Sequence, residues 1–292
     1  MTWRTTWTGE RQDLEAIDQI LTELAEPPVD ATSLIRDDDA SAEPEDAPWL
    51  LHAYTEDKIS QHILDMLPDG TAAPEQEELE DRDWVAHALT GLGIVRPGPF
   101  VLFGRHDAEE AEVLDGIKLQ IEANQAFGTG HHPTTFGCLE ALGNLSGTPT
   151  NILDIGTGSG VLAIAARKLY ASTPIFATDI DQTSVDIAIE NAGINGTNDL
   201  KFDTAAGTDC ALTQSAAPFD LVFANILAGP LKELAPDIAA IAAPGATIIL
   251  AGLLDEQRDG VIATYQDHGI SVAAIGGEER WPILTLTKKT AS

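Results

Sequence analysis

The sequence predicts an α/β protein with a Rossmann-like sheet of seven strands in its second half and a smaller α+β domain before it. Three observations indicate this fold class. Apolar runs alternate with helical patterns from Asn151 onward, a glycine-rich turn follows the first run, and the preceding residues are acidic and rich in proline. Alternating strands and helices are typical of a parallel sheet with both faces covered.

Each predicted strand of the second half is a short apolar run bounded by turn residues. The expected strands are Asn151–Ile155, Ile175–Asp179, Leu200–Asp203, Leu221–Asn225, Ala246–Ala251, Ser271–Ile275 and Ile283–Thr287, with helices in the gaps.

The first domain is predicted from helical spacing and from prolines. Residues 10–26 and 57–67 carry apolar side chains at helical intervals and are followed by prolines, so we expect two amphipathic helices. Strands are expected near Thr2–Thr8 and Trp49–Tyr54. Together these elements indicate a small α+β domain over residues 1–68.

Two acidic segments are expected to connect the structured parts of the chain. Asp37–Pro48 is a polar, acidic connection between the two helices, and a linker follows the first domain. Asp69–Asp83 is rich in acidic residues and contains Pro74, a composition typical of extended linkers. We therefore assign residues 69–105 to a linker and connecting segment, and residues 106–292 to the second domain.

The net charge indicates which partners the protein can bind. The chain has 47 acidic and 16 basic residues, a net charge of −31, and 28 of the acidic residues but only 7 basic ones precede Gly116. Binding to a phosphate backbone depends on Lys and Arg, so we expect no direct contact with nucleic acid. A negative field attracts a basic protein; the alternative is that the acidity adapts the protein for solubility or salt.

Targeting and metal signals are absent from the sequence. No apolar run is long enough to cross a membrane or to act as a signal peptide, so we expect a soluble, cytoplasmic protein without membrane contact. Cys138 and Cys210 are not spaced as metal ligands and are interpreted as small core residues. The neighbours His131 and His132 lack further ligands, so no metal site is predicted. Nothing in the sequence indicates an oligomeric state.

A glycine-rich turn, Gly156–Gly160, joins the first predicted strand to the helical pattern that begins at Val161. Glycine tolerates the backbone conformations of such a turn and lets a ligand lie against the main chain. The third glycine, Gly160, follows Gly158 by two residues, whereas the dinucleotide fingerprint G-x-G-x-x-G requires three. The order of strand, glycine turn and helix predicts a site for a nucleotide-type ligand at Gly156, Gly158 and Gly160, and their spacing disfavours a dinucleotide.

Carboxylates flank this turn. Asp179 ends the second strand 23 residues after Gly156, close to the offset of about 20 residues at which an acid reaches ribose hydroxyls; the alternative is a bare surface carboxylate. Asp181 is the second candidate for the acid that binds the ribose, and it is expected to cap the helix that begins near Gln182. Asp154 lies two residues before the turn, and it either lies near a ligand or accepts hydrogen bonds from the loop.

Two further motifs narrow the family. Residues 126–135, Ala-Phe-Gly-Thr-Gly-His-His-Pro-Thr-Thr, precede the first strand, and residues 224–231, Ala-Asn-Ile-Leu-Ala-Gly-Pro-Leu, follow the fourth. Both resemble the signatures of the methyltransferases that modify ribosomal protein eleven of the large subunit, and the likeness runs from about Asp83 to the C-terminus. The resemblance implies a class I methyltransferase fold, S-adenosylmethionine as cofactor, and a ferredoxin-like N-terminal domain that docks the basic ribosomal protein.

The resemblance also implies the reaction and its residues. It implies trimethylation of lysine side chains and of the N-terminal α-amine of the ribosomal protein. It places cofactor contacts at Thr135, Gly156, Asp179 and Asn225, and it places an acid such as Asp154 near the methionine ammonium group.

Three alternatives remain beside this reading. Because residues before Asp83 match only in size and general character, one alternative is a methyltransferase of another protein or of a small-molecule amine. A non-enzymatic nucleotide-binding or interaction protein and an NAD-linked dehydrogenase are disfavoured by the G-x-G-x-G spacing and by the motif at Asn225.

The chemistry requires a neutral amine, because methyl transfer from a sulfonium is an in-line displacement. Asn225 is predicted at the C-terminal end of the fourth strand, where open α/β sheets place ligands. Its amide oxygen can accept an N–H from the target amine, and the backbone carbonyl of Ile226 or Leu227 can accept another. We therefore predict Asn225 and Leu227 as catalytic residues; the alternative is that Asn225 only caps the following helix.

Three residues in loops and helix ends complete the predicted site. Thr135 follows Pro133, which is favoured at the first helical position, so its hydroxyl can meet a carboxylate or ribose edge, or only cap the helix. Trp281 either packs against the core or holds a methylated ammonium group by cation–π attraction. Phe127 either covers the cofactor or belongs to the core.

Overall fold

The computed structural model describes residues 2–24, 31–36, 49–55, 58–64, 67, 71–79, 93–122, 132–278 and 280–290. The chain divides into two compact units, residues 1–84 and 85–292. In the described parts of the chain, the helices lack the length and apolar character that crossing a membrane requires.

The first unit contains a four-stranded antiparallel sheet. Its elements are β1 (Thr2–Gly9), α1 (Arg11–Leu24), β2 (Ala31–Arg36), β3 (Trp49–Thr55), α2 (Gln61–Leu64) and β4 (Glu75–Leu79). The strand order is β2-β3-β1-β4, and every neighbouring pair is antiparallel. This βαββαβ order is the ferredoxin-like arrangement that the family resemblance implies.

The core of this unit lies between α1, α2 and the sheet. Leu14, Ile17 and Leu21 form the apolar face of α1 and pack with Trp7 of β1 and Leu51 of β3. The predicted helix over residues 10–26 is thus α1. Of the predicted helix over residues 57–67, the structure assigns Gln61–Leu64 to α2, and parts of the remainder lie outside the described residues.

The linker prediction for Asp69–Asp83 is wrong for residues 75–79. These residues form β4, which pairs with β1 from Thr2↔Leu79 to Thr6↔Glu75. Glu75, Glu77 and Glu78 are exposed, so this strand lacks the apolar alternation that identifies most strands. Charged side chains are typical of edge strands, because they discourage pairing with other chains. Residues 37–48, predicted as a polar connection, lie outside the described residues.

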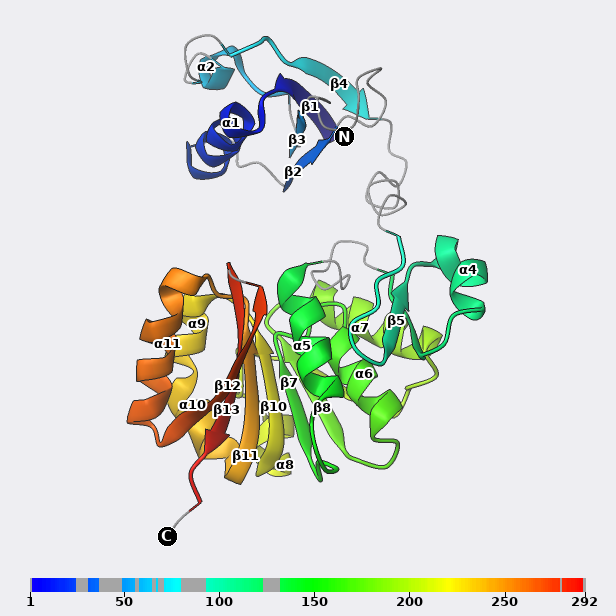
Figure 1. Cartoon of the computed structure of the whole chain (residues 1–292), viewed down its shortest axis with the longest axis vertical. Helices are drawn as coiled ribbons and strands as arrows, with labels where there is room; N and C mark the ends of the chain where they lie inside the picture. The colour runs from blue at the N-terminus through cyan, green and yellow to red at the C-terminus, as the bar shows by residue number, and fades with distance from the viewer. Residues whose placement is uncertain are drawn as a thin grey trace. The chain divides into compact units, whose positions relative to one another are not determined.

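The second unit is built on a seven-stranded sheet (Figure 1). Its strands are β7 (Ile152–Ile155), β8 (Ile175–Asp179), β9 (Lys201–Thr204), β10 (Phe219–Asn225), β11 (Ala242–Ala251), β12 (Ile270–Glu278) and β13 (Trp281–Lys288). The order is β12-β13-β11-β10-β7-β8-β9, and β13 is antiparallel to both of its neighbours. All seven predicted strands are therefore confirmed.

Helices cover both faces of this sheet (Figure 1). One face packs against α5 (Pro133–Gly143), α6 (Val161–Leu169) and α7 (Gln182–Ile194), and the other against α9 (Ala228–Glu233), α10 (Ala235–Ile241) and α11 (Asp255–Asp267). The short helix α8 (Ala211–Ala216) precedes β10. β10 lies beside β7, so the strand order reverses there, and such a switch point leaves a crevice at the C-terminal strand ends.

A two-stranded parallel sheet precedes the main sheet. β5 (Phe100–Phe103) and β6 (Ile117–Gln120) pair, and η1 (Arg105–Asp107) and α4 (Ala108–Glu112) connect them. Phe100, Leu102 and Leu119 are buried in the same core as α5 and α6. The compact second unit therefore begins before residue 106, and the assignment of residues 100–103 to a connecting segment is wrong.

Candidate active site

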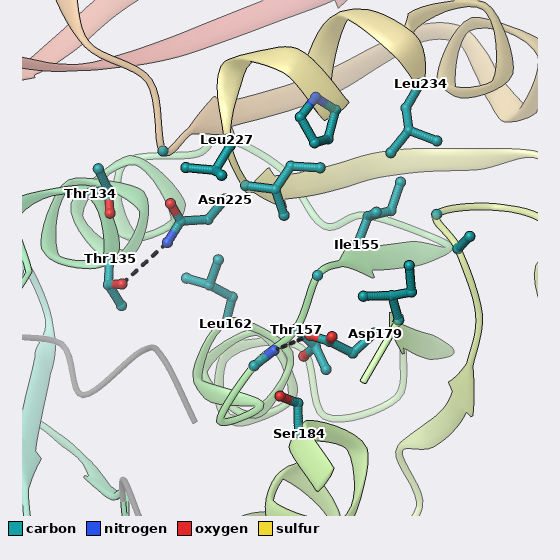
Figure 2. Close-up of a pocket in the computed structure, with 18 of the residues that line it drawn as sticks. Thr134, Thr135, Ile155, Thr157, Leu162, Asp179, Ser184, Asn225, Leu227 and Leu234 are labelled. Carbon is teal, nitrogen blue, oxygen red and sulfur yellow. Dashed lines mark hydrogen bonds between the residues drawn. The ribbon is translucent and has the colours of Figure 1, made fainter. Parts of the chain in front are cut away.

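A cavity of about 970 Å³ lies at the C-terminal ends of β7, β8 and β10 (Figure 2). It occupies the crevice that the switch in strand order creates. Seven of the predicted site residues line it: Thr135, Gly156, Gly158, Asp179, Asn225, Leu227 and Trp281. Asp154 and Gly160 do not line the cavity and lie behind it, in β7 and at the start of α6.

The turn between β7 and α6 needs its glycines for different reasons. Gly156, Gly158 and Gly160 have φ angles of 68°, 54° and 81°, in the left-handed region that favours glycine. A Cβ on Gly156 would lie 2.3 Å from Cγ2 of Ile226. A Cβ on Gly160 would lie 3.0 Å from Cβ of Ala188 in α7. Gly156 thus keeps the cavity side of the loop clear, whereas Gly160 lets α7 pack against its back.

Asp179 is fixed by the main chain at the end of β8. Its Oδ2 accepts a hydrogen bond of 2.9 Å from the backbone N–H of Gly158, and its Oδ1 accepts one of 3.1 Å from Asp181 N–H. Each carboxylate oxygen has a further lone pair for a ligand. Asp181 accepts from the N–H groups of Thr183 and Ser184, both at 3.1 Å, so the prediction that it caps this helix is confirmed.

Asp154 is buried behind the loop. Its Oδ2 accepts from Thr157 Oγ1 at 2.7 Å and from Ala163 N–H at 3.2 Å, and its Oδ1 has no hydrogen-bond partner among the described residues. Burial raises the pKa of this carboxyl to about 6, against the lowering effect of both hydrogen bonds. The side chain therefore ties the loop to α6, which is the structural role weighed in the sequence analysis.

Asn225 and Thr135 meet across the cavity from β10 and α5. The Asn225 amide donates from Nδ2 to Thr135 Oγ1 at 3.2 Å, and Figure 2 shows this bond. The Oδ1 atom of Asn225 is buried without a partner in the described part of the chain. Pro133 is the first residue of α5, as predicted, and His132 is its N-cap, with Nδ1 accepting the N–H of Thr134 at 3.4 Å.

Leu227 lies at the mouth of the cavity, with an exposed fraction of 73%. Its carbonyl accepts the N–H of Leu231 at 3.0 Å, which is the first bond of α9. A second lone pair on this oxygen is available to a ligand. The carbonyl of Ile226 points toward Gly252, where a Cβ would lie 2.4 Å from its oxygen.

Trp281, at the start of β13, packs edge to face against His132. Their ring centroids are 4.8 Å apart and the ring planes meet at 71°. Burial lowers the pKa of His132, and the charge of Glu278 opposes this, so the imidazole is neutral at pH 7. The indole thus makes a packing contact and also lines the cavity.

Several lining residues were missed by the sequence analysis: Ile180, Ala206, Gly207, Glu233, Leu234 and Asp237. Ile180 directly follows β8, and Ala206 and Gly207 follow β9, so the rule that ligands bind at C-terminal strand ends could have found them. Glu233, Leu234 and Asp237 lie in or beside α9 and α10. Their place in the lining depends on how α9 and α10 pack beside the cavity, and no sequence signal indicates this packing.

Two predicted features lie partly outside the described residues. Phe127 and His131 are not described. Within the ranges that are, no group of three or more His, Cys, Asp or Glu side chains could hold a metal ion. Cys138 is buried and Cys210 partly buried, and both are free thiols.

Comparison with known proteins identifies the family. The family model described as ribosomal protein L11 methyltransferase (PrmA) matches residues 10–289. A ribosomal protein L11 methyltransferase of Brucella abortus (strain S19) is 50% identical over 221 residues, which cover 75% of this chain and 77% of that protein. One of Rhizobium meliloti (strain 1021) is 46% identical over 217 residues, 73% of this chain and 74% of the relative.

A solved structure supports the same assignment. The ribosomal protein L11 methylase of Lactobacillus delbrueckii subsp. bulgaricus superposes with a TM-score of 0.61 and 27% sequence identity, covering 68% of this chain and 99% of that one. The family model, the relatives and the solved structure all indicate the same family. The chain belongs to the ribosomal protein L11 methyltransferase family, whose members are class I, S-adenosylmethionine-dependent protein methyltransferases.

Proposed function

We propose that the protein transfers methyl groups from S-adenosylmethionine to amines of ribosomal protein L11, at lysine side chains and at the N-terminal α-amine. The observation that carries this proposal is that Gly158, Asp179 and Asn225 line one cavity at the C-terminal strand ends. The curated relatives that resemble the chain bear the name ribosomal protein L11 methyltransferase.

The residues of the cavity fit the cofactor. Asp179 offers carboxylate lone pairs to ribose hydroxyls. The same carboxylate accepts the N–H of Gly158 and so holds the backbone of the glycine turn in place. The described lining contains three carboxylates, those of Asp179, Glu233 and Asp237, and neither Lys nor Arg. A lining of this charge suits a ligand with a net positive charge. When bound, S-adenosylmethionine supplies a methyl group on a cationic sulfonium.

The second set of residues fits an aliphatic amine. Lysine has an ordinary pKa of about 10.4 and must lose a proton before it attacks. The apolar side chain of Leu227 lines the cavity beside Asn225, and an amine that binds against it would be partly desolvated, which favours the neutral form. The unpaired Oδ1 of Asn225 and the carbonyl of Leu227 then act as acceptors that orient the nitrogen, with Thr135 fixing the Asn225 amide.

The fit to a basic ribosomal protein rests on charge. The net charge of −31 attracts such a partner and repels nucleic acid. We propose that the ferredoxin-like unit docks the substrate, that the unit containing the cavity performs the transfer, and that the reaction takes place in the cytoplasm. A tethered substrate would present more than one amine to the same cavity.

Incubation of the protein with purified ribosomal protein L11 and isotope-labelled S-adenosylmethionine tests the proposal. Mass spectrometry should find labelled methyl groups on lysines and on the N-terminal amine of L11. Asp179→Ala protein is the control for labelling that does not depend on the cavity. Labelling of other proteins or of small-molecule amines, with unmodified L11, would favour the alternative methyltransferase.

A further inference from the structure

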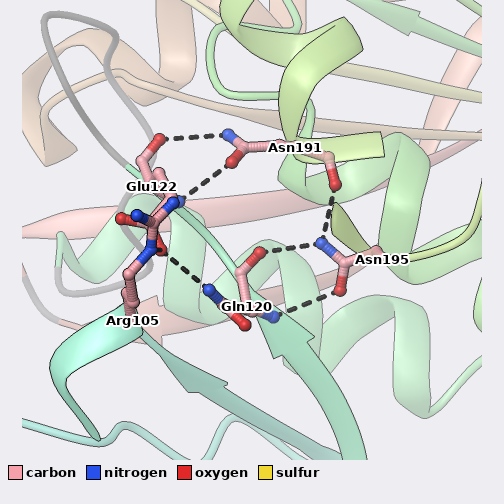
Figure 3. A network of polar contacts seen from close by, with 5 residues as sticks. All are labelled: Arg105, Gln120, Glu122, Asn191 and Asn195. Atoms are coloured by element: carbon pink, nitrogen blue, oxygen red, sulfur yellow. Dashed lines mark hydrogen bonds and ion pairs between the residues drawn. The ribbon is translucent and has the colours of Figure 1, made fainter. Parts of the chain in front are cut away.

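Asn191, in α7, and Asn195, the C-cap residue one turn later, hold the chain at and just beyond β6 (Figure 3). Asn195 accepts the N–H of Gln120 on Oδ1 at 3.1 Å and donates from Nδ2 to its carbonyl at 2.7 Å. Asn191 does the same with Glu122, at 2.9 Å and 3.1 Å. Asn191 and Asn195 are four residues apart and share a helix face, and Gln120 and Glu122 are two residues apart and share a side of an extended chain. The two side-chain amides therefore make the backbone hydrogen bonds that a neighbouring strand would otherwise make.

Asn191 differs from Asn195 in its third hydrogen bond. Its Nδ2 also donates to the carbonyl of Ser159 at 2.9 Å, whereas the Nδ2 of Asn195 donates to the carbonyl of Asn191 at 2.8 Å. Both Asn191 and Ser159 are fully buried. Asn191 thus joins the strand segment at Glu122 to the glycine turn, and both of its amide hydrogens are used.

The Ser159 carbonyl lies on the back of the turn that forms the cofactor site. Gly158, one residue earlier, donates its N–H to Asp179 and lines the cavity. Gly160, one residue later, has a φ angle of 81° and lies so close to α7 that an added Cβ would be 3.0 Å from Cβ of Ala188. Glycines on both sides leave the Ser159 peptide with wide conformational freedom, so a buried hydrogen bond to its carbonyl restricts the turn.

We propose that Asn191 is a positioning residue for S-adenosylmethionine binding. It fixes the Ser159 carbonyl and thereby the orientation of the backbone that Gly158 presents to the cavity. Asn195 stabilises β6 in the same way but leaves the turn untouched. The inference concerns the cofactor alone, so it stands or falls independently of which amine or protein is methylated.

The matched pair Asn191→Ala and Asn195→Ala tests this proposal. Each variant loses both hydrogen bonds to the segment at β6, so both should unfold at lower temperature than the wild type. Only Asn191→Ala should bind S-adenosylmethionine about tenfold more weakly by calorimetry, because only it releases a buried carbonyl of the turn. Its KM for the cofactor should rise with kcat unchanged at saturation, and amide hydrogen exchange should increase over residues 156–163.

Asn191→Asp is a second variant that tests the proposal. It keeps the size of the side chain and the acceptor for Glu122 N–H but loses the donors to Ser159 and Glu122, so it should match Asn191→Ala in cofactor affinity. Equal affinity in folded Asn191→Ala and Asn195→Ala proteins would overturn the proposal. If both Asn191 variants fail to fold while Asn195→Ala folds, Asn191 serves the fold as a whole, and the proposal is equally overturned.

Discussion

The two ends of the cavity are built differently. At the loop end, Gly158 and Asp179 are joined by a hydrogen bond of 2.9 Å, and both Asp179 oxygens are held by backbone N–H groups. At the other end, which we propose takes the amine and call the amine end, Asn225 makes one bond of 3.2 Å to Thr135, and its Oδ1 lacks a partner among the described residues. The protein fixes the loop end with its own bonds and leaves acceptors for a ligand at the amine end.

This difference matches the demands of the two ligands. A cofactor that is the same in every turnover is best held by a rigid, preorganised surface. An amine loses an N–H donor with each methylation, so acceptors that the fold does not already use suit it. Substitutions at the loop end should therefore reduce cofactor affinity, and those at the amine end should reduce the rate of transfer.

The largest effect is expected from Gly156→Ala. The new Cβ would lie 2.3 Å from Ile226 at a φ angle of 68°, a strain of about 1 to 3 kcal/mol before any clash is relieved. We expect loss of detectable S-adenosylmethionine binding by calorimetry. Gly229→Ala in α9 is the control, since its added Cβ meets no described atom within 4 Å outside its chain neighbours and the backbone of its own helix. Normal cofactor affinity in Gly156→Ala would show that the loop end is not rigid.

Asp179→Ala should come next. Charge-assisted hydrogen bonds contribute about 1.5 to 3 kcal/mol each, so the dissociation constant for S-adenosylmethionine should rise roughly 10- to 100-fold. Asp181→Ala separates affinity from folding, because it removes the α7 cap at a cost of about 1 kcal/mol in unfolding free energy and should leave affinity unchanged. Equal affinity losses in the two variants would contradict the assignment of Asp179.

Asn225→Ala tests the amine end. It should lower kcat by about tenfold at saturating cofactor, because an orienting acceptor acts in the transfer step. Thr135→Val is the companion variant, since it removes the hydroxyl that holds the Asn225 amide and keeps the branched shape. An Asn225→Ala protein with normal kcat and weakened cofactor affinity would move this residue to the loop end.

The last effect concerns the pH dependence of stability at Asp154, where no change in cofactor affinity or in the rate of transfer is at issue. The folded-state pKa of about 6 lies above the ordinary value of 3.8, so the fold binds this proton more tightly than the unfolded chain does. Its stabilising effect is complete below the ordinary value and is lost as pH rises through about 6. Relative to Asp154→Asn, the wild type should lose about 1 to 3 kcal/mol of unfolding free energy between about pH 4 and about pH 7. Urea unfolding of both cofactor-free proteins measures this, and a difference that does not change with pH would contradict it.

The sheet of the second unit could be predicted because its strands are buried. Leu221, Val222 and Phe223 form a continuous apolar run that is buried on both faces, which is the pattern of a parallel strand. The glycine turn and Asp179 could be found because their spacing follows from the geometry of a strand, a turn and a helix. Asp181 could be assigned as a cap because short acids precede helices.

The remaining elements depend on contacts that a linear pattern does not contain. β4 could not be predicted because Glu75, Glu77 and Glu78 are exposed on an edge strand, so the segment lacks the apolar alternation that identifies a strand in a sequence. Asn191 reads as an ordinary polar residue within α7, and its importance comes from Glu122 and Ser159, which lie 69 and 32 residues away in the sequence.

The charged strand β4 also bears on how copies of the protein behave beside one another. β4 is the last strand of its sheet, and one of its sides has no strand neighbour within the described residues. A second copy that tried to extend the sheet through its own β4 would place Glu75, Glu77 and Glu78 next to the same three carboxylates, and like charges facing each other across strands are destabilising. The strand at the edge of the first unit therefore disfavours the joining of sheets from separate copies in a concentrated solution of the protein.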